Sequence, residues 1–293
     1  MQNISNWGIT KIMWEDLKYY LQFDFVKYAL IVGGLISLCC AILGVTLVLK
    51  RYSMIGDGLS HVAFGAMTIA MVLTIMDMYV MLPVTIIVAI LLIRLTDKGK
   101  IKNDSAIAML SVGALAFGYM LVSLFSSSAN ISGDVCSSLF GLTSILTLST
   151  FEVWFCLGIT VFLLIFFVIF HNKIFAVTFD ENFSKATGVK AAVYNNIIAI
   201  IIGIVIVLAM KLVGSLLISA LIVFPALSAI RLFKSYKMVI IFASIIGVVN
   251  SLIGILVSIL LATPVGATIV IIDILTYLIC WLVEIIIRNL KKA

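Results

Sequence analysis

Residues 29–49 read ALIVGGLISLCCAILGVTLVL, a stretch with no charged side chain. A helix rises about 1.5 Å per residue, so about 20 residues cross the roughly 30 Å hydrocarbon core of a bilayer. This run therefore predicts a transmembrane helix. It ends at the basic pair Lys50 and Arg51, which is where a span would meet water.

Similar apolar runs recur along the rest of the chain, one of them interrupted only by His61. They cover residues 59–76, 78–93, 105–125, 153–170, 191–210, 212–230 and 238–272. The last run is too long for one helix, and Pro264 divides it in two because proline interrupts a helix. The pattern predicts nine spans, or eight if one pair merges or re-enters the membrane, with 191–210 and 212–230 forming a tight hairpin around Lys211.

The composition agrees with this pattern. Hydrophobic residues make up 64% of the chain and charged residues 11%, against about 45–50% and 25% in soluble domains. These values exclude a soluble globular, a disordered or a disulfide-stabilised class. We therefore predict an all-α, polytopic helical membrane protein with about 8–9 transmembrane helices.

The net charge of +6 is a topology signal, because the basic residues sit in short segments between the apolar runs. With nine spans, every such cluster falls on one side of the membrane; the exceptions are Lys11, Lys18, Lys27 and Lys211. The positive-inside rule makes that side cytoplasmic, together with the C-terminus. No nucleic-acid partner is implied.

Residues 1–24 place apolar side chains at helical spacing, beginning with Ile9, Ile12 and Met13. They predict an amphipathic helix on the membrane surface, with a poorly ordered tail as the alternative. Residues 25–290 then form a single transmembrane domain.

The most distinctive polar feature lies at residues 55–61, IGDGLSH. Asp57 and His61 are four residues apart, so they share one face of a helix. Counted along a helix from Arg51, His61 lies about 15 Å deep, where ionisable groups usually face a cavity or pathway. A carboxylate with an imidazole suits a divalent cation such as zinc or manganese. The alternative is that the two side chains only pair with each other, since a closed metal site needs about four ligands.

A second feature lies at residues 178–188, TFDENFSKATG. Thr178 and Glu181 have capping-box spacing, and Gly188 stands where a helix would end. The segment 178–189 therefore predicts a short helix of about two turns along the membrane. Phe179 and Phe183 would lie on one side of it, as an aromatic pair that inserts into a groove of a partner. The alternative is an ordinary linker helix on the lipid surface.

Two further polar residues fall within predicted spans, Asn250 and Asp273. Asp273 either joins a transport pathway or hydrogen-bonds a neighbouring helix. The chain has no G-x-x-x-x-G-K-[ST] phosphate loop, so it carries no nucleotide site of that type.

Together these stretches resemble the membrane permeases of ABC-type divalent-metal importers, the zinc, manganese and iron-chelate group called the ABC-3 family. The resemblance begins at residues 49–61, LKRYSMIGDGLSH, and continues at 104–109, DSAIAM, and 138–141, SLFG. It includes residues 180–189, DENFSKATGV, and closes with 211–231 and 264–270. It covers residues 28–290, nearly the whole chain.

This resemblance implies a homodimer in a prokaryotic plasma membrane, served by cytoplasmic ATPase subunits and by an extracytoplasmic metal-binding protein. It implies a translocation subunit, not an enzyme, with no permanently bound cofactor. Asp57 and His61 become transient ligands of the transported metal, with zinc first because the GDGLSH wording is closer to zinc-type members, and manganese next. The elements that would dock into the ATPase are Phe179, Asp180, Glu181, Phe183 and Gly188.

The alternative function is an ion-coupled secondary metal transporter, or a channel, that works without an ATPase. Coupling to an ion gradient would then run through Asp57, His61 or Asp273.

Overall fold

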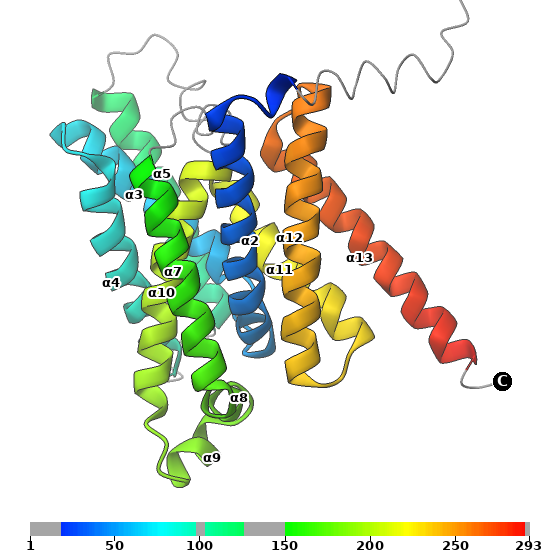
Figure 1. The fold of residues 1–293 in the computed structure, drawn as a ribbon. Coiled ribbons are helices and arrows are strands. Elements are labelled where there is room, and N and C mark those ends of the chain that lie inside the picture. The colour runs from blue at the N-terminus through cyan, green and yellow to red at the C-terminus, as the bar shows by residue number, and fades with distance from the viewer. Residues whose placement is uncertain (1–18, 98–102, 126–149, 291–293) are drawn as a thin grey trace, which may run out of the picture.

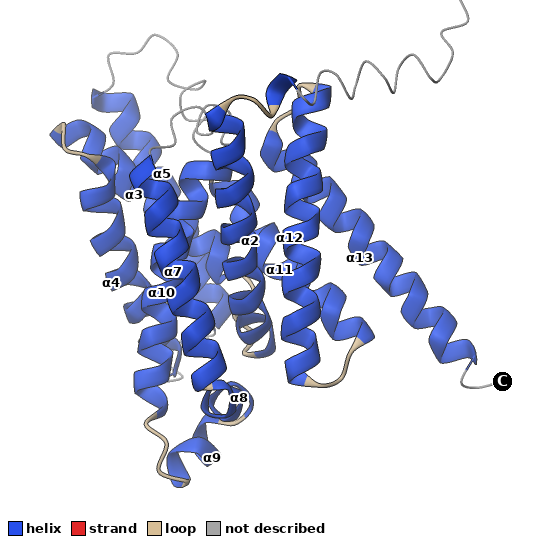
Figure 2. Cartoon of the chain, viewed as in Figure 1, coloured by secondary structure: helices blue, strands red, loops and turns tan. Residues whose placement is uncertain are grey.

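The described elements of the computed structural model are helices joined by short turns (Figure 2). The structure describes residues 19–97, 103–125 and 150–290. The helices are α2 (Asp24–Leu49), α3 (Ile55–Leu73), α4 (Asp77–Asp97), α5 (Asn103–Phe125), α7 (Thr150–Ile169), α8 (His171–Phe179), α9 (Glu181–Ala186), α10 (Ala191–Val213), α11 (Ser215–Leu232), α12 (Tyr236–Leu261) and α13 (Val265–Leu290). The predicted surface helix falls mainly in residues 1–18, which lie outside the described part, as does the SLFG stretch at 138–141.

Within the described residues, eight helices are long and apolar enough to cross a membrane. They are α2, α3, α4, α5, α7, α10, α12 and α13. The apolar part of α11, Leu217–Leu232, is shorter than the others. The prediction of an all-α polytopic membrane protein with 8–9 spans is confirmed.

Helix α2 lies in the middle of the bundle, where it contacts α7, α10, α11 and α12. Figure 1 shows it between α7 and α12, with α3, α4 and α5 on one side and α13 on the other. Helix α3 packs against α4, α5 and α11, whereas α13 contacts α11 and α12 and leans away from the bundle (Figure 1).

A stripe of small residues lets α12 approach its neighbours closely. Gly247 faces Ser37 and Ala41 of α2, and the Ser251 hydroxyl donates to the Gly33 carbonyl at 3.2 Å. In lipid there is no hydrophobic driving force between helices, so close packing of small residues holds the helices together. The side of α12 that carries Gly247 and Ser251 is therefore a packing face.

The break between α10 and α11 differs from the prediction. Helix α10 runs on through residue 213, and the chain turns at Gly214 with φ 80° and ψ 167°, a conformation open almost only to glycine. The turn is therefore set by Gly214, because a backbone requirement outweighs the charge of Lys211 three residues earlier. Helix α11 then packs mainly on α2, α12 and α13 and does not lie along α10 as a hairpin partner.

One end of the bundle collects the basic turns, and we call it the basic end. Here α2, α4, α7, α11 and α13 end and α3, α5, α10 and α12 begin, at the lower side of Figure 1. Helices α8 and α9 also lie at this end, with α8 seen nearly end-on, so it crosses the direction of the spans (Figure 1).

Candidate functional site

Asp57 and His61 lie in the first two turns of α3. The Asp57 Oδ1 atom is 3.3 Å from the His61 Nε2 atom, which confirms that the pair shares one helix face. From α5, the Ser111 hydroxyl donates a hydrogen bond of 3.0 Å to Asp57 Oδ2. The structure thus gathers a carboxylate, an imidazole and a hydroxyl from two helices.

The close approach of α5 depends on Gly58. A Cβ at this position would lie 2.8 Å from the Ile107 side chain and 3.5 Å from its carbonyl oxygen. Glycine leaves room for α5 there, and Ser111 follows Ile107 by one helical turn on the same face. The glycine before Leu59 therefore positions the hydroxyl that meets Asp57.

The two site residues differ in burial. His61 is 6% exposed, while the Asp57 side chain is 30% exposed. His61 Nδ1 is buried and has no hydrogen-bond partner. The site is therefore enclosed on the imidazole side and open on the carboxylate side.

The path from Arg51 to His61 is not a continuous helix. Residues 50–54 form a turn, with Arg51 at φ 62°, and α3 begins only at Ile55. His61 therefore lies about 9 Å along the helix from its first residue, at 1.5 Å per residue. The count of ten helical residues from Arg51 is therefore not met, because Arg51 lies in the turn before α3.

The geometry suits a transient metal ligand pair. Nitrogen and oxygen ligands lie about 2.0–2.2 Å from zinc, so two donor atoms 3.3 Å apart can both reach one ion. Among the described residues, no group of three or more His, Cys, Asp or Glu side chains is placed so that it could hold a metal ion. The Ser111 hydroxyl lies beside this pair and holds the Asp57 carboxylate by its hydrogen bond.

Asn250 and Asp273 form a separate polar cluster between α12 and α13. The Asn250 amide donates to Asp273 Oδ1 at 2.7 Å, and the Thr276 hydroxyl donates to Asn250 Oδ1 at 3.1 Å. Asp273 is 1% exposed, and its second oxygen has no partner. The structure does not bring this cluster to Asp57, because α2 and α11 lie between the two groups of helices.

The segment predicted as one helix at 178–189 is divided in two. Thr178 still belongs to α8, where its hydroxyl donates to the Ile174 carbonyl, so it is not the cap. The chain is extended at Asp180, whose carboxylate accepts from the Phe183 amide at 2.9 Å and caps α9. Asp180 replaces Thr178 because a residue already in a helix cannot start the next one. Helix α8 itself was not predicted.

The predicted stop at Gly188 is confirmed. Gly188 has φ 84°, and the Val189 amide donates to the Ser184 carbonyl while the Gly188 amide donates to the Lys185 carbonyl. These two bonds are those of a Schellman motif, in which glycine takes the left-handed position.

Phe179 and Phe183 do not share a helix face, contrary to the prediction. Phe179 ends α8 and packs on Phe175, with ring centroids 4.7 Å apart, whereas Phe183 belongs to α9. Both remain exposed, Phe183 by 62%. The extended residue Asp180 separates them, so Phe183 alone projects from α9.

A polar chain ties α9 to the spans. Glu181 accepts from Lys185 at 2.6 Å and from Asn195 of α10 at 3.0 Å, and Asn195 accepts from Lys50 at the end of α2, also at 2.6 Å. Partial burial raises the pKa of Glu181, but hydrogen bonds from Lys185 and Asn195 outweigh burial, and the pKa lies below its ordinary value. The carboxylate therefore stays ionised at neutral pH and keeps α9 attached to α2 and α10.

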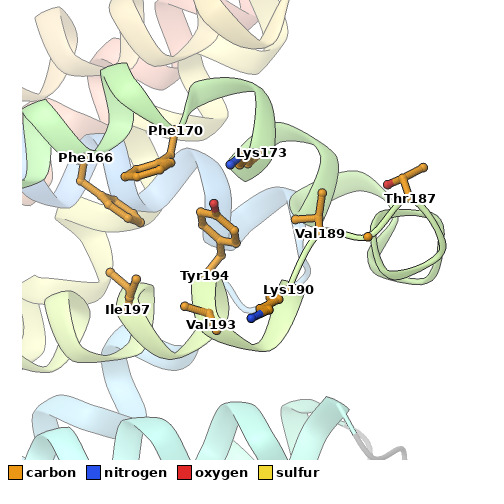
Figure 3. A pocket seen from close by; sticks show the side chains of 10 residues that line it. Phe166, Phe170, Lys173, Thr187, Val189, Lys190, Val193, Tyr194 and Ile197 are labelled. Atoms are coloured by element: carbon orange, nitrogen blue, oxygen red, sulfur yellow. The ribbon is translucent and has the colours of Figure 1, made fainter.

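A pocket of about 460 Å³ opens beside α9, between the end of α7 and the start of α10. Figure 3 shows Phe166, Phe170 and Tyr194 gathered on one side of it, and Lys173 and Lys190 nearer the α9 side. Two ammonium groups beside an aromatic wall suit an acidic or aromatic side chain of a partner.

Sequence reasoning missed Ser111, Asn195 and Thr276, and it used Lys50 only as a topology signal. Each of these residues acts through a contact with a distant part of the chain. A serine or asparagine in an apolar run is the only signal that one sequence offers for such a contact.

The family model described as the ABC 3 transport family matches residues 22–284. The chain is 27% identical over 271 residues to the manganese import system permease protein ScaB of Streptococcus gordonii, covering 92% of this chain and 95% of that protein. It is 25% identical over 252 residues to the manganese transport system membrane protein MntC of Halalkalibacterium halodurans, covering 86% of this chain and 85% of that protein.

Among solved structures, the fold is similar to a chain of PsaBC from Streptococcus pneumoniae in complex with Fab. The TM-score is 0.78 at 26% identity, and the match covers 91% of this chain and 94% of that chain.

Proposed function

The chain belongs to the ABC 3 transport family, and from that premise we propose that it is the permease of an ATP-driven importer of divalent metal ions. The resemblance to such permeases is confirmed, as is the expectation of a transport subunit that is not itself an enzyme. The observation that supports the proposal is the Asp57–His61 pair, with Ser111 beside it.

Manganese is the first candidate and zinc the second. Oxygen ligands such as a carboxylate suit manganese, and an imidazole suits zinc, so the site has a ligand for each ion. Two relatives in this comparison are named as manganese permeases, which supports manganese as the first candidate, whereas the GDGLSH wording favours zinc. An open set of two weak ligands fits passage, because an ion must leave as well as enter.

Helix α9 is the proposed docking element for an ATPase subunit. The polar chain through Glu181 and Asn195 joins α9 to α10 and to the end of α2. A force on α9 would therefore reach the central helix of the bundle without a flexible link. This connection supports alternating access driven by ATP binding and hydrolysis in the partner.

The remaining parts of the proposal concern topology and assembly. The basic end is cytoplasmic in a prokaryotic plasma membrane, since it gathers the lysine and arginine turns. The assembly in this proposal is a homodimer, as the family resemblance implies. An extracytoplasmic metal-binding protein would deliver the ion at the opposite end.

Uptake into proteoliposomes tests the function. Vesicles that contain this chain and its ATPase, with the metal-binding protein added outside, should accumulate manganese only when ATP is present inside, on the side of α9, with zinc as the competing ion. Accumulation driven by a proton or sodium gradient without ATP would instead show the alternative, an ion-coupled transporter or channel.

Co-purification tests the docking element. Phe183→Ala should lower ATPase recovery at least fivefold, because truncating an aromatic anchor at an interface costs roughly 1 kcal/mol or more. Phe151→Ala is the matched control, since Phe151 is 71% exposed at the opposite end of the bundle. Equal ATPase recovery with both variants would remove Phe183 from the interface.

A further inference from the structure

A groove of about 640 Å³ runs along the outside of the bundle, with α2 as its floor and α7 and α12 as its walls. The three helices lie side by side in Figure 1, with α2 in the middle. The apolar lining includes Leu38, Ile42, Leu164, Val168, Ile241 and Ile245. In a membrane this groove opens toward lipid.

The groove has one polar end, which lies at the basic end of the bundle. His171 and Asn172 from the start of α8 and Lys237 from the start of α12 line it there. The imidazole of His171 rests on the ring of Tyr236, with centroids 5.4 Å apart. No acidic residue lines the groove, and Lys237 forms no ion pair with any described residue.

We propose that this groove binds an anionic phospholipid from the membrane leaflet at the basic end. The Lys237 ammonium and the Asn172 amide offer donors to a phosphate, and charge-assisted bonds of this kind are the strong ones. Basic pockets between transmembrane helices are a recognised way to hold anionic head groups. An acyl chain then lies against Ile241, Ile245 and the facing residues of α7.

The dimensions fit one leaflet. From Lys237 to Ile245 the α12 wall rises about 12 Å, at 1.5 Å per residue, and one leaflet of hydrocarbon is about half of 30 Å. A lipid in this place puts its phosphate beside Lys237 and its acyl chain along the apolar walls. A helix of a partner protein would cover the apolar walls but would leave the Lys237 ammonium without a counter-charge.

The occupant would also brace α7 against α12. Helix α7 leads directly into α8 and α9, so a lipid wedged beside it steadies the elements at the basic end. This inference concerns the outer face of the bundle and does not depend on which metal is transported.

Native mass spectrometry of the full-length chain tests the proposal. The protein is reconstituted in vesicles of equal phosphatidylglycerol and phosphatidylcholine, extracted in mild detergent and weighed with its retained lipids. The wild type should retain phosphatidylglycerol about fivefold over phosphatidylcholine, the ratio expected for one lysine near a membrane surface. Lys237→Ala should bring this ratio close to one, and excess inorganic phosphate should not displace the lipid.

Two matched controls keep the test decisive. Lys234→Ala changes an exposed lysine that does not line the groove and should leave the ratio within twofold. Ile241→Trp, which fills the groove, should lower total lipid retention, whereas Ile253→Trp on the same helix should not; the two isoleucines are 42% and 45% exposed. Equal retention of both lipids by the wild type, or equal effects of the two lysine variants, would overturn the proposal. So would a photo-reactive side chain at position 241 that cross-links a second protein chain instead of phospholipid.

Discussion

Asp57 of α3 and Asp273 of α13 both lie within membrane-crossing helices, and their surroundings are opposite. Asp57 faces an imidazole and a hydroxyl, and its side chain is 30% exposed. Asp273 faces the amide of Asn250 and is 1% exposed. An acid beside a second metal-binding group and an opening can pass an ion, whereas an acid sealed against an amide holds two helices together. Depth in the membrane alone does not separate a pathway from a packing contact.

The largest expected effect comes from removing either Asp57 or His61, which we call the open pair because the Asp57 side chain is partly exposed. Asp57→Asn or His61→Ala should lower ATP-dependent manganese uptake at least about 100-fold, because even the loss of a residue that only orients a metal ligand costs about 10–100-fold. Membrane insertion and ATPase recovery should stay normal, as judged by protein yield and co-purification. Uptake within threefold of wild type in both variants would contradict the claim that Asp57, unlike Asp273, lies on the transport pathway.

A second variant makes the open pair resemble the sealed one. His61→Asn replaces the acid–imidazole pair by an acid–amide pair like Asn250 and Asp273. The hydrogen-bonded contact can persist, but the imidazole nitrogen is lost as a ligand and only a neutral amide oxygen stands in its place. Uptake should fall at least tenfold while the thermal unfolding temperature changes little. A variant that transports normally would mean that pairing, and not metal binding, is the role of His61.

Ser111, which touches Asp57 but is not one of the two proposed ligands, should matter less. Ser111→Ala removes the hydroxyl that donates to Asp57 Oδ2 and leaves the carboxylate free to rotate. We expect the KM for manganese to rise about 3–10-fold with kcat nearly unchanged, since the hydroxyl positions Asp57 in the resting site. Ser244→Ala is a control, because the Ser244 hydroxyl donates only to the Ile240 carbonyl in α12.

The smallest effect on transport is expected at the buried Asn250–Asp273 pair. Asp273→Leu leaves the buried Asn250 amide without its acceptor, which costs about 1–3 kcal/mol of stability. Thermal unfolding should therefore move to lower temperature, while manganese uptake per folded molecule stays within twofold. Loss of uptake in a variant of normal stability would place Asp273 on the pathway after all.

Much of this architecture could be predicted from the sequence because lipid imposes a simple rule. Charge-free runs of about 20 residues mark the spans, and Pro264 marks a break, since neither signal depends on distant contacts. The turn at Gly214 was missed because charge was used as the marker and backbone conformation decided the position. The division at Asp180 was missed because two capping candidates lie two residues apart in the sequence.

The candidate site was predictable only in part. Asp57 and His61 share a face through local helix geometry, so their spacing in the sequence was sufficient to predict their contact. Ser111 and Asn195 reach their partners through packing of helices far apart in the chain, which one sequence does not show. For Asp273 the two readings, pathway or helix contact, could be weighed only once Asn250 was seen to donate to it at 2.7 Å.

The central claim is that His61 binds the transported ion together with Asp57. Pulsed electron paramagnetic resonance of Mn²⁺ added to the permease–ATPase complex tests it directly, with the permease alone labelled with ¹⁵N-histidine. The chain has two histidines, so His61→Gln and His171→Gln are matched variants. We predict a ¹⁵N coupling to manganese that is lost in His61→Gln and kept in His171→Gln. Bound manganese with no histidine coupling, or a coupling that survives His61→Gln, would contradict the account.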